Sequence, residues 1–67
     1  MMGITVNGER LERPEGITIA GLLGSLDLDT GRVAVEVDGV IVRQPAWQET
    51  TLPAGAQVEI VQFVGGG

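Results

Sequence analysis

Three stretches of the chain alternate between apolar and polar residues, which is the period expected of a half-buried β-strand. In residues 3–7 this alternation places Ile4 and Val6 on one side of the strand. Residues 33–38 follow the same rule with three valines and form the clearest strand in the sequence. Residues 57–64 are predicted to be the last strand, and they come just before the final glycines.

The first two of these strands are each followed by a strong turn signal. The sequence has Asn-Gly at 7–8 and Asp-Gly at 38–39, and these residue pairs accept the positive φ angles of a tight hairpin. Residues 9–13 are therefore predicted to return as a second strand, and their alternating charges suit the edge of a sheet. Residues 40–42 return in the same way after the second turn.

A helical period begins after Thr18, whose hydroxyl suits a helix N-cap. The apolar residues at i, i+3, i+4 and i+7 are Ile19, Leu22, Leu23 and Leu26. Gly21 and Gly24 lie between these apolar positions, and each lowers helix stability by roughly 1 kcal/mol relative to alanine. The helix is therefore expected to depend on docking its apolar side onto a sheet.

The order of these elements predicts a two-layer α+β domain, with one helix packed on a mixed four- to five-stranded sheet. The helix connects two strands by a crossover, which implies some parallel pairing. A parallel central pair of the first and last strands is expected, because it would bury the most apolar segments. Residues 45–48 are predicted to form a turn or short 3₁₀ segment, and Trp47 within it is expected to pack in the core or at its rim. The predicted domain spans residues 1–64, and residues 65–67 form a flexible glycine tail.

Composition narrows the possible chemistry. The chain has 67 residues and contains no Cys, His or Lys, so the usual ligand sets for zinc, iron–sulfur clusters and haem are absent. No metal site and no cofactor bound by the chain itself are expected. A cysteine nucleophile, a histidine base and a Schiff-base lysine are also missing, which predicts that the chain is not an enzyme.

The formal net charge of −5 argues against nucleic acid or an anionic membrane as a partner. It suits a protein partner with a basic face, although solubility alone also accounts for it. The first residues lack the pattern of a signal peptide, and no apolar run reaches transmembrane length. Together with the missing cysteines, these features predict a cytoplasmic protein.

The sequence finishes with a short segment that suits threading into another protein's site. Its residues are Phe63, Val64, Gly65, Gly66 and Gly67. Glycine has no Cβ and accepts both signs of φ, and residues 64–67 reach about 13 Å when extended. A carboxylate at Gly67, once activated as a mixed anhydride, would meet no thiol, amine or imidazole side chain within its own chain. A frayed end or a cloning scar is the alternative interpretation.

Alternation along the last predicted strand suggests a docking surface beside this tail. If Val58 and Ile60 face the helix, Val61 and Phe63 lie on the open face of the sheet. Exposed apolar residues next to a functional segment are candidate partner contacts, and we add Val64, Gly65 and Gly66 to them. Packing of Phe63 on neighbouring strands or on Trp47 is the alternative. Arg43 and Glu59 are expected to be solvated.

Together, these elements resemble the ubiquitin-like β-grasp sulfur carriers, and most of all the ThiS family. The resemblance covers the whole chain and is carried by residues 6–9, 18–23, 35–42, Trp47 and 58–67. Residues 43–45 depart from the family, which often has Pro-Arg before the tryptophan segment. Residues 55–56 depart as well, because Gly-Asp is common there. Both departures fall in turns and concern local geometry.

The resemblance implies a carrier chemistry at Gly67. In this family an E1-like adenylyltransferase of the ThiF type uses ATP and Mg²⁺ to adenylate the terminal carboxylate. A persulfide from a cysteine desulfurase or a rhodanese then displaces AMP, leaving a thiocarboxylate. A thiazole synthase of the ThiG type takes that sulfur into the thiazole ring of thiamine, with the carrier acting as a cosubstrate.

Three other functions share this architecture. One is a sister carrier, either the small subunit of molybdopterin synthase or a carrier for tRNA thiolation or amino-acid synthesis. Another is a ubiquitin-like protein modifier that forms isopeptides with target lysines. The third is an interaction domain whose glycine tail is inert.

Overall fold

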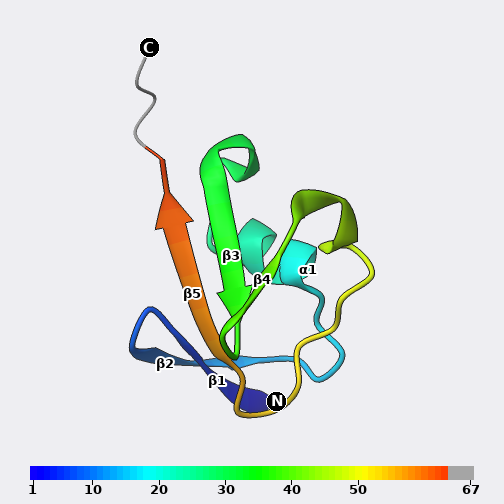
Figure 1. The fold of residues 1–67 in the computed structure, drawn as a ribbon. Coiled ribbons are helices and arrows are strands. Elements are labelled where there is room, and N and C mark those ends of the chain that lie inside the picture. The colour runs from blue at the N-terminus through cyan, green and yellow to red at the C-terminus, as the bar shows by residue number, and fades with distance from the viewer. Residues whose placement is uncertain (64–67) are drawn as a thin grey trace.

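The structure is a computed structural model, and it describes residues 1–63. Its five strands form a single sheet in the order β2-β1-β5-β3-β4, and α1 lies against one face of it (Figure 1). The elements in chain order are β1 (Met2–Val6), β2 (Glu9–Arg13), α1 (Ile19–Ser25), η1 (Thr30–Arg32), β3 (Val33–Val37), β4 (Val40–Val42), η2 (Gln44–Ala46) and β5 (Gln57–Gln62). The predicted α+β fold, with one helix on a mixed sheet, is confirmed.

The centre of the sheet is the predicted parallel pair of first and last strands. In β1 and β5, Thr5 lies opposite Gln57 and Val6 opposite Val58. All other strand pairs are antiparallel. The charged strand β2 is one edge of the sheet, as its sequence predicted, and β4 is the other.

Both hairpins turn where the sequence predicts. Asn7 and Gly8 have φ angles of 50° and 83°, and Asp38 and Gly39 have φ angles of 50° and 87°. Positive φ at both central positions matches the right-handed twist of the two strands that the turn joins. These two dipeptides therefore set the pairing of β1 with β2 and of β3 with β4.

Helix α1 is capped at its start and stopped by a left-handed residue after its end. The Oγ1 of Thr18 accepts the N–H of Gly21 at 3.0 Å, as an N-cap does. Asp27 has a φ of 57°, which the helix cannot continue through. Leu22 is fully buried, whereas Leu26 comes after the last helical residue and is only half-buried. The predicted apolar stripe is thus confirmed over its first three members.

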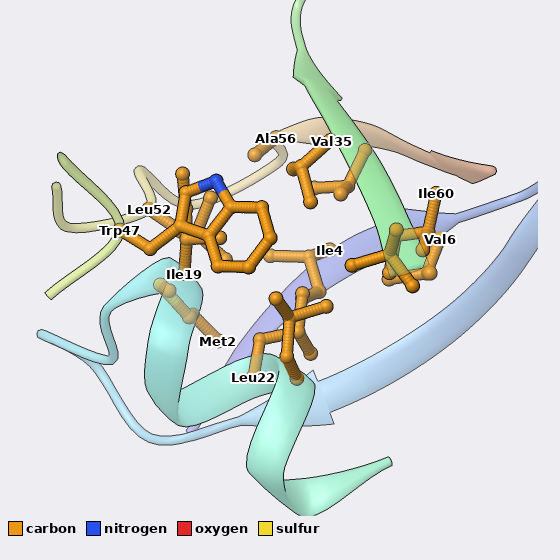
Figure 2. Packing of buried hydrophobic residues seen from close by; sticks show 13 residues of the cluster. Met2, Ile4, Val6, Ile19, Leu22, Val35, Trp47, Leu52, Ala56 and Ile60 are labelled. Carbon is orange, nitrogen blue, oxygen red and sulfur yellow. The ribbon is translucent and has the colours of Figure 1, made fainter. Parts of the chain in front are cut away.

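The core fills the space between α1 and the sheet (Figure 2). Leu22 lies near Ile4 of β1 in its middle, while Trp47 and Leu52 pack beside Ile19 at one end. Trp47 is 4% exposed, and its Nε1–H donates to the carbonyl oxygen of Val42 at 2.7 Å. A buried indole needs such a partner for its N–H, so the predicted packing role of Trp47 is confirmed.

Two local features differ from the prediction. β5 ends at Gln62, so Phe63, which was predicted to be part of the strand, lies just beyond it. Val64, the last residue of the predicted strand, is outside the described residues. β5 ends at Gln62 because its partner strand β3 begins at Val33, which lies opposite Gln62. A turn is expected at Gly31, but its 3₁₀ form, η1, was not predicted, because a short polar loop carries no periodic signal. The predicted glycine tail at 65–67 is also outside the described residues.

Candidate functional site

The candidate site begins near the end of β5. There the side-chain amide of Asn7 forms the hydrogen bonds that a neighbouring strand would otherwise provide. The Oδ1 of Asn7 accepts the backbone N–H of Ile60 at 2.7 Å. The Nδ2 of Asn7 donates to the carbonyl oxygen of Ile60 at 3.1 Å. β1 has already turned away at this level, so the amide of Asn7 satisfies the backbone groups that a longer β1 would have satisfied.

The other side of β5 is held by backbone alone. The N–H of Phe63 donates to the carbonyl oxygen of Arg32 at 2.7 Å, one position beyond the last strand pair. β5 is therefore fixed on both sides close to its end, by Asn7 at Ile60 and by Arg32 at Phe63. These two contacts fix the backbone of Ile60 and Phe63 relative to the rest of the sheet. The predicted site residues Val64, Gly65, Gly66 and Gly67 lie outside the described residues.

The open face of the sheet, away from α1, carries exposed apolar side chains beside this exit. Val61 is 56% exposed and Phe63 is 58% exposed, while Val58 and Ile60 are buried under the helix. The predicted division of this strand between the two faces is therefore confirmed. That Val61 and Phe63 contact a partner stays a prediction.

Ile41 belongs to the same face and was missed in the sequence. It lies opposite Glu36 in the β3–β4 pair and is 67% exposed. Ala34, Ile41 and Phe63 line one hollow beside η2. Alternation along residues 40–42 could have assigned Ile41 to the face opposite Val40 and Val42. The residues beside it on that face belong to other strands, so the sequence did not reveal them as a group.

Two carboxylates complete this face. Glu36 of β3 lies directly opposite Glu59 of β5, and both point away from the helix. Within residues 1–63 the sole ion pair joins Arg10 to Glu12, at 3.9 Å on the β2 edge. Glu59 is exposed, as the sequence predicted, and so is Arg43. The face therefore combines exposed apolar residues with two carboxylates that form no ion pair in the described part of the chain.

The described residues contain neither a cluster of metal ligands nor a buried polar residue. Among residues 1–63 no three acidic side chains are close enough together to hold a metal ion, and no polar or charged residue is buried. Over the same residues, none of the helices is long and apolar enough to cross a membrane. An open groove of about 420 Å³ lies between the first hairpin and the end of α1, lined mainly by Val6, Leu11, Leu26, Leu28 and Ile60. What these residues offer is an exposed face of apolar and acidic side chains beside the end of β5.

Comparison with known proteins agrees with this geometry. A family model described as the ThiS family matches residues 4–67. The crystal structure of the thiamine biosynthesis protein ThiS from Geobacter metallireducens superposes with a TM-score of 0.86 at 33% identity, covering 98% of this chain and 100% of that one. The solution structure of a thiamine biosynthesis protein from the same organism superposes with a TM-score of 0.78, covering 98% and 88%.

Similar sequences occur in proteins of two sizes. The ycf40 protein of Porphyra purpurea is 30% identical over 66 residues, which are 98% of this chain and 93% of that protein. A thiazole synthase of Paramagnetospirillum magneticum is 36% identical over 66 residues, but these are 20% of its length. A thiazole synthase of Magnetococcus marinus shows the same identity and coverage. The chain thus spans about a fifth of the two thiazole synthases that it matches.

Proposed function

The chain belongs to the ThiS family, and we propose that it is a sulfur carrier for thiamine biosynthesis whose reacting group is the carboxylate of Gly67. The observation that carries the proposal is the family match, which extends through the glycine tail to residue 67. The close superposition on a thiamine biosynthesis protein supports the pathway. The hydrogen bonds that hold β5 near its end also support the proposal, because an activating enzyme must receive the tail in a defined direction.

The proposed reaction has three steps. A carboxylate oxygen of Gly67 attacks the α-phosphorus of ATP, and pyrophosphate leaves with Mg²⁺ held by a ThiF-type adenylyltransferase. The terminal sulfur of a persulfide, supplied by a cysteine desulfurase or a rhodanese, then attacks the carbonyl carbon and AMP leaves. A second thiol breaks the sulfur–sulfur bond, is itself oxidised to a disulfide, and releases the thiocarboxylate at Gly67.

The composition of the chain fits a cosubstrate in this scheme. An acyl adenylate reacts with thiols, amines and imidazoles, and the sequence contains no Cys, Lys or His side chain. The activated Gly67 would therefore survive until the persulfide arrives. All catalytic groups, ATP and Mg²⁺ are assigned to the partners, and no cofactor is assigned to this chain.

A ThiG-type thiazole synthase is the proposed acceptor of the sulfur. In two proteins named thiazole synthase, a segment similar to this chain is covalently joined to the rest of the polypeptide. Such a linkage keeps the segment at a high effective concentration beside its neighbour, as suits two parts that work together. We assign the contacts to Val61 and Phe63 on the open face and to Val64, Gly65 and Gly66 in the tail.

The test is ATP–pyrophosphate exchange with the adenylyltransferase from the same genome. One added alanine after Gly67 displaces the carboxylate by about 3.5 Å, and displacements on this scale lower rates on the order of 100-fold. Gly66→Val should also fail, because a β-branched side chain restricts φ and fills a narrow channel. Gly24→Ala in α1, away from the tail, is the control, because it also adds a methyl group to a glycine and should leave the exchange rate unchanged.

Three measurements complete the test. Melting curves should be alike for the parent and the two tail variants, since neither change touches the core. Intact-mass and fragmentation analysis of the chain isolated from cells should place the sulfur on Gly67, and rescue of a thiazole auxotroph separates this pathway from its sister carriers. Exchange and sulfuration of the alanine-extended chain at the parent's rate would refute the proposal.

A further inference from the structure

Glu36 and Glu59 are brought together by the register of β3 and β5. Hydrogen bonds of the same ladder join Asp38 N–H to the Gln57 carbonyl at 2.8 Å and Phe63 N–H to the Arg32 carbonyl at 2.7 Å. Counting in steps of two from either bond places Glu36 and Glu59 in a hydrogen-bonded pair. The Cβ atoms of such a pair are about 5 Å apart, so the two side chains stand next to each other.

This arrangement is unfavourable for the isolated domain. Like charges directly opposite each other destabilise a sheet. Within residues 1–63 neither carboxylate forms an ion pair. Arg10 pairs with Glu12, Arg13 bonds to Ser25 and to the Glu12 carbonyl, and Arg32 and Arg43 form no ion pair within these residues. The chain also carries a net charge of −5, which adds to the repulsion. A feature with this local penalty is expected where a ligand or partner supplies the missing positive charge.

The carboxylates border a small apolar hollow. Its lining comprises Ala34, Val35, Glu36, Ile41, Glu59 and Val61. Its volume of about 140 Å³ lies below the roughly 300–1,000 Å³ of pockets that hold small molecules. A single protein side chain with an apolar stem and a cationic end has the chemistry that this hollow requires.

We propose that the hollow receives an arginine of the enzyme that activates the chain, an inference that rests on the proposed function. The stem of the arginine would lie on Ile41 and Val61, and its guanidinium would donate to both Glu36 and Glu59. Arginine suits the site better than lysine, because the guanidinium is planar, carries five donors and is more weakly hydrated than an ammonium group. Phe63 on the same face then lies beside the tail that enters the enzyme's active site.

The experiment compares two double variants that have the same net charge. Glu36→Gln with Glu59→Gln removes the carboxylates of the hollow. Glu15→Gln with Glu49→Gln removes two exposed carboxylates that lie on loops away from the open face. The carrier's KM and the maximal rate of ATP–pyrophosphate exchange are measured at several salt concentrations, and binding is measured by calorimetry.

The hollow variant should raise the carrier's KM and Kd about 10-fold or more and flatten their salt dependence, while the maximal rate stays near the parent's. The control should change both constants far less. The melting temperature of the hollow variant should stay level or rise, because repulsion is relieved. A purely structural role of the pair would instead lower stability and binding together.

Arginine-selective labelling with phenylglyoxal identifies the partner group. One arginine of the enzyme should be protected by the parent chain and by the control, but not by the hollow variant. Equal KM and Kd for the two double variants, or no differentially protected arginine, would overturn the proposal while leaving the sulfur-carrier function intact. If the parent chain supports no exchange, the proposed function fails. Calorimetry then still tests the arginine proposal. That proposal is refuted if the enzyme does not bind the parent chain, or if it binds the parent chain and the hollow variant equally well.

Discussion

The side-chain amide of Asn7 forms both hydrogen bonds that the backbone of Ile60 would otherwise make with a neighbouring strand, although the two residues are 53 positions apart. This contact lies where β1 turns away and β5 continues towards its exit (Figure 1). It joins the turn between β1 and β2 to the last part of β5. Asn7 thus has two roles, one in the turn and one in the sheet.

Replacing Asn7 by glycine should destabilise the domain by about 1–3 kcal/mol, measured by urea unfolding. Glycine retains the positive φ of the turn, so the loss reports the two hydrogen bonds and the unpartnered N–H and C=O of Ile60. Asn7→Ala should be worse, because alanine adds strain at a φ of 50°. A glycine variant as stable as the parent would show that the amide contact does not contribute to stability.

Leu22→Ala should reduce the free energy of unfolding by roughly 2–5 kcal/mol. The side chain is fully buried between α1 and the sheet, so its removal leaves a cavity in a small core (Figure 2). A domain of this size has little stability in reserve, so thermal melting should show partial unfolding near room temperature. Leu28→Ala, at a half-buried position, is the matched control and should lose clearly less. Equal effects would place the core elsewhere.

Gly24→Ala should stabilise the domain by about 1 kcal/mol through helix propensity. Apart from its two chain neighbours and the backbone of the helix itself, no atom within residues 1–63 lies within 4 Å of the Cβ that this substitution adds, and the position is exposed. Gly21→Ala serves as the contrast, because its Cβ would meet Ile17 Cγ1 at 3.1 Å and Thr18 Oγ1 at 3.4 Å. The gain at Gly21 should therefore be smaller or absent. Urea unfolding of both variants checks this, and equal gains would contradict it.

Phe63→Glu should weaken binding to the adenylyltransferase and to the thiazole synthase by about 10-fold or more, with an unchanged melting temperature. Phe63 is 58% exposed on the open face, so the fold does not need it, whereas a docked partner would bury it. Val40→Glu is the matched control, since Val40 is 64% exposed and out of phase with Ile41 on the open face. Calorimetry measures both. Unchanged affinity of the Phe63 variant for both partners would exclude this face as the docking surface.

Local sequence determined most of the secondary structure of this protein, apart from the end of β5 and the 3₁₀ form of η1. The Asn-Gly and Asp-Gly turns, the valine alternation of β3 and the leucine spacing of α1 act over a few residues, and each appears where it was predicted. Burial followed as well, because alternation assigned Val61 and Phe63 to the open face without knowledge of their neighbours. The parallel central pair of β1 and β5 was predicted because it buries the most apolar segments.

Tertiary structure decided which distant residues meet. The register between β3 and β5 places Glu36 opposite Glu59, and a one-residue slip would separate them and invert both faces. The contact of Asn7 with Ile60 exists because β1 stops short of β5 in the assembled sheet. No local period encodes such pairs, since they depend on how the strands align once the core has packed. The open face of the sheet is therefore a product of register, built from segments that lie far apart in the sequence.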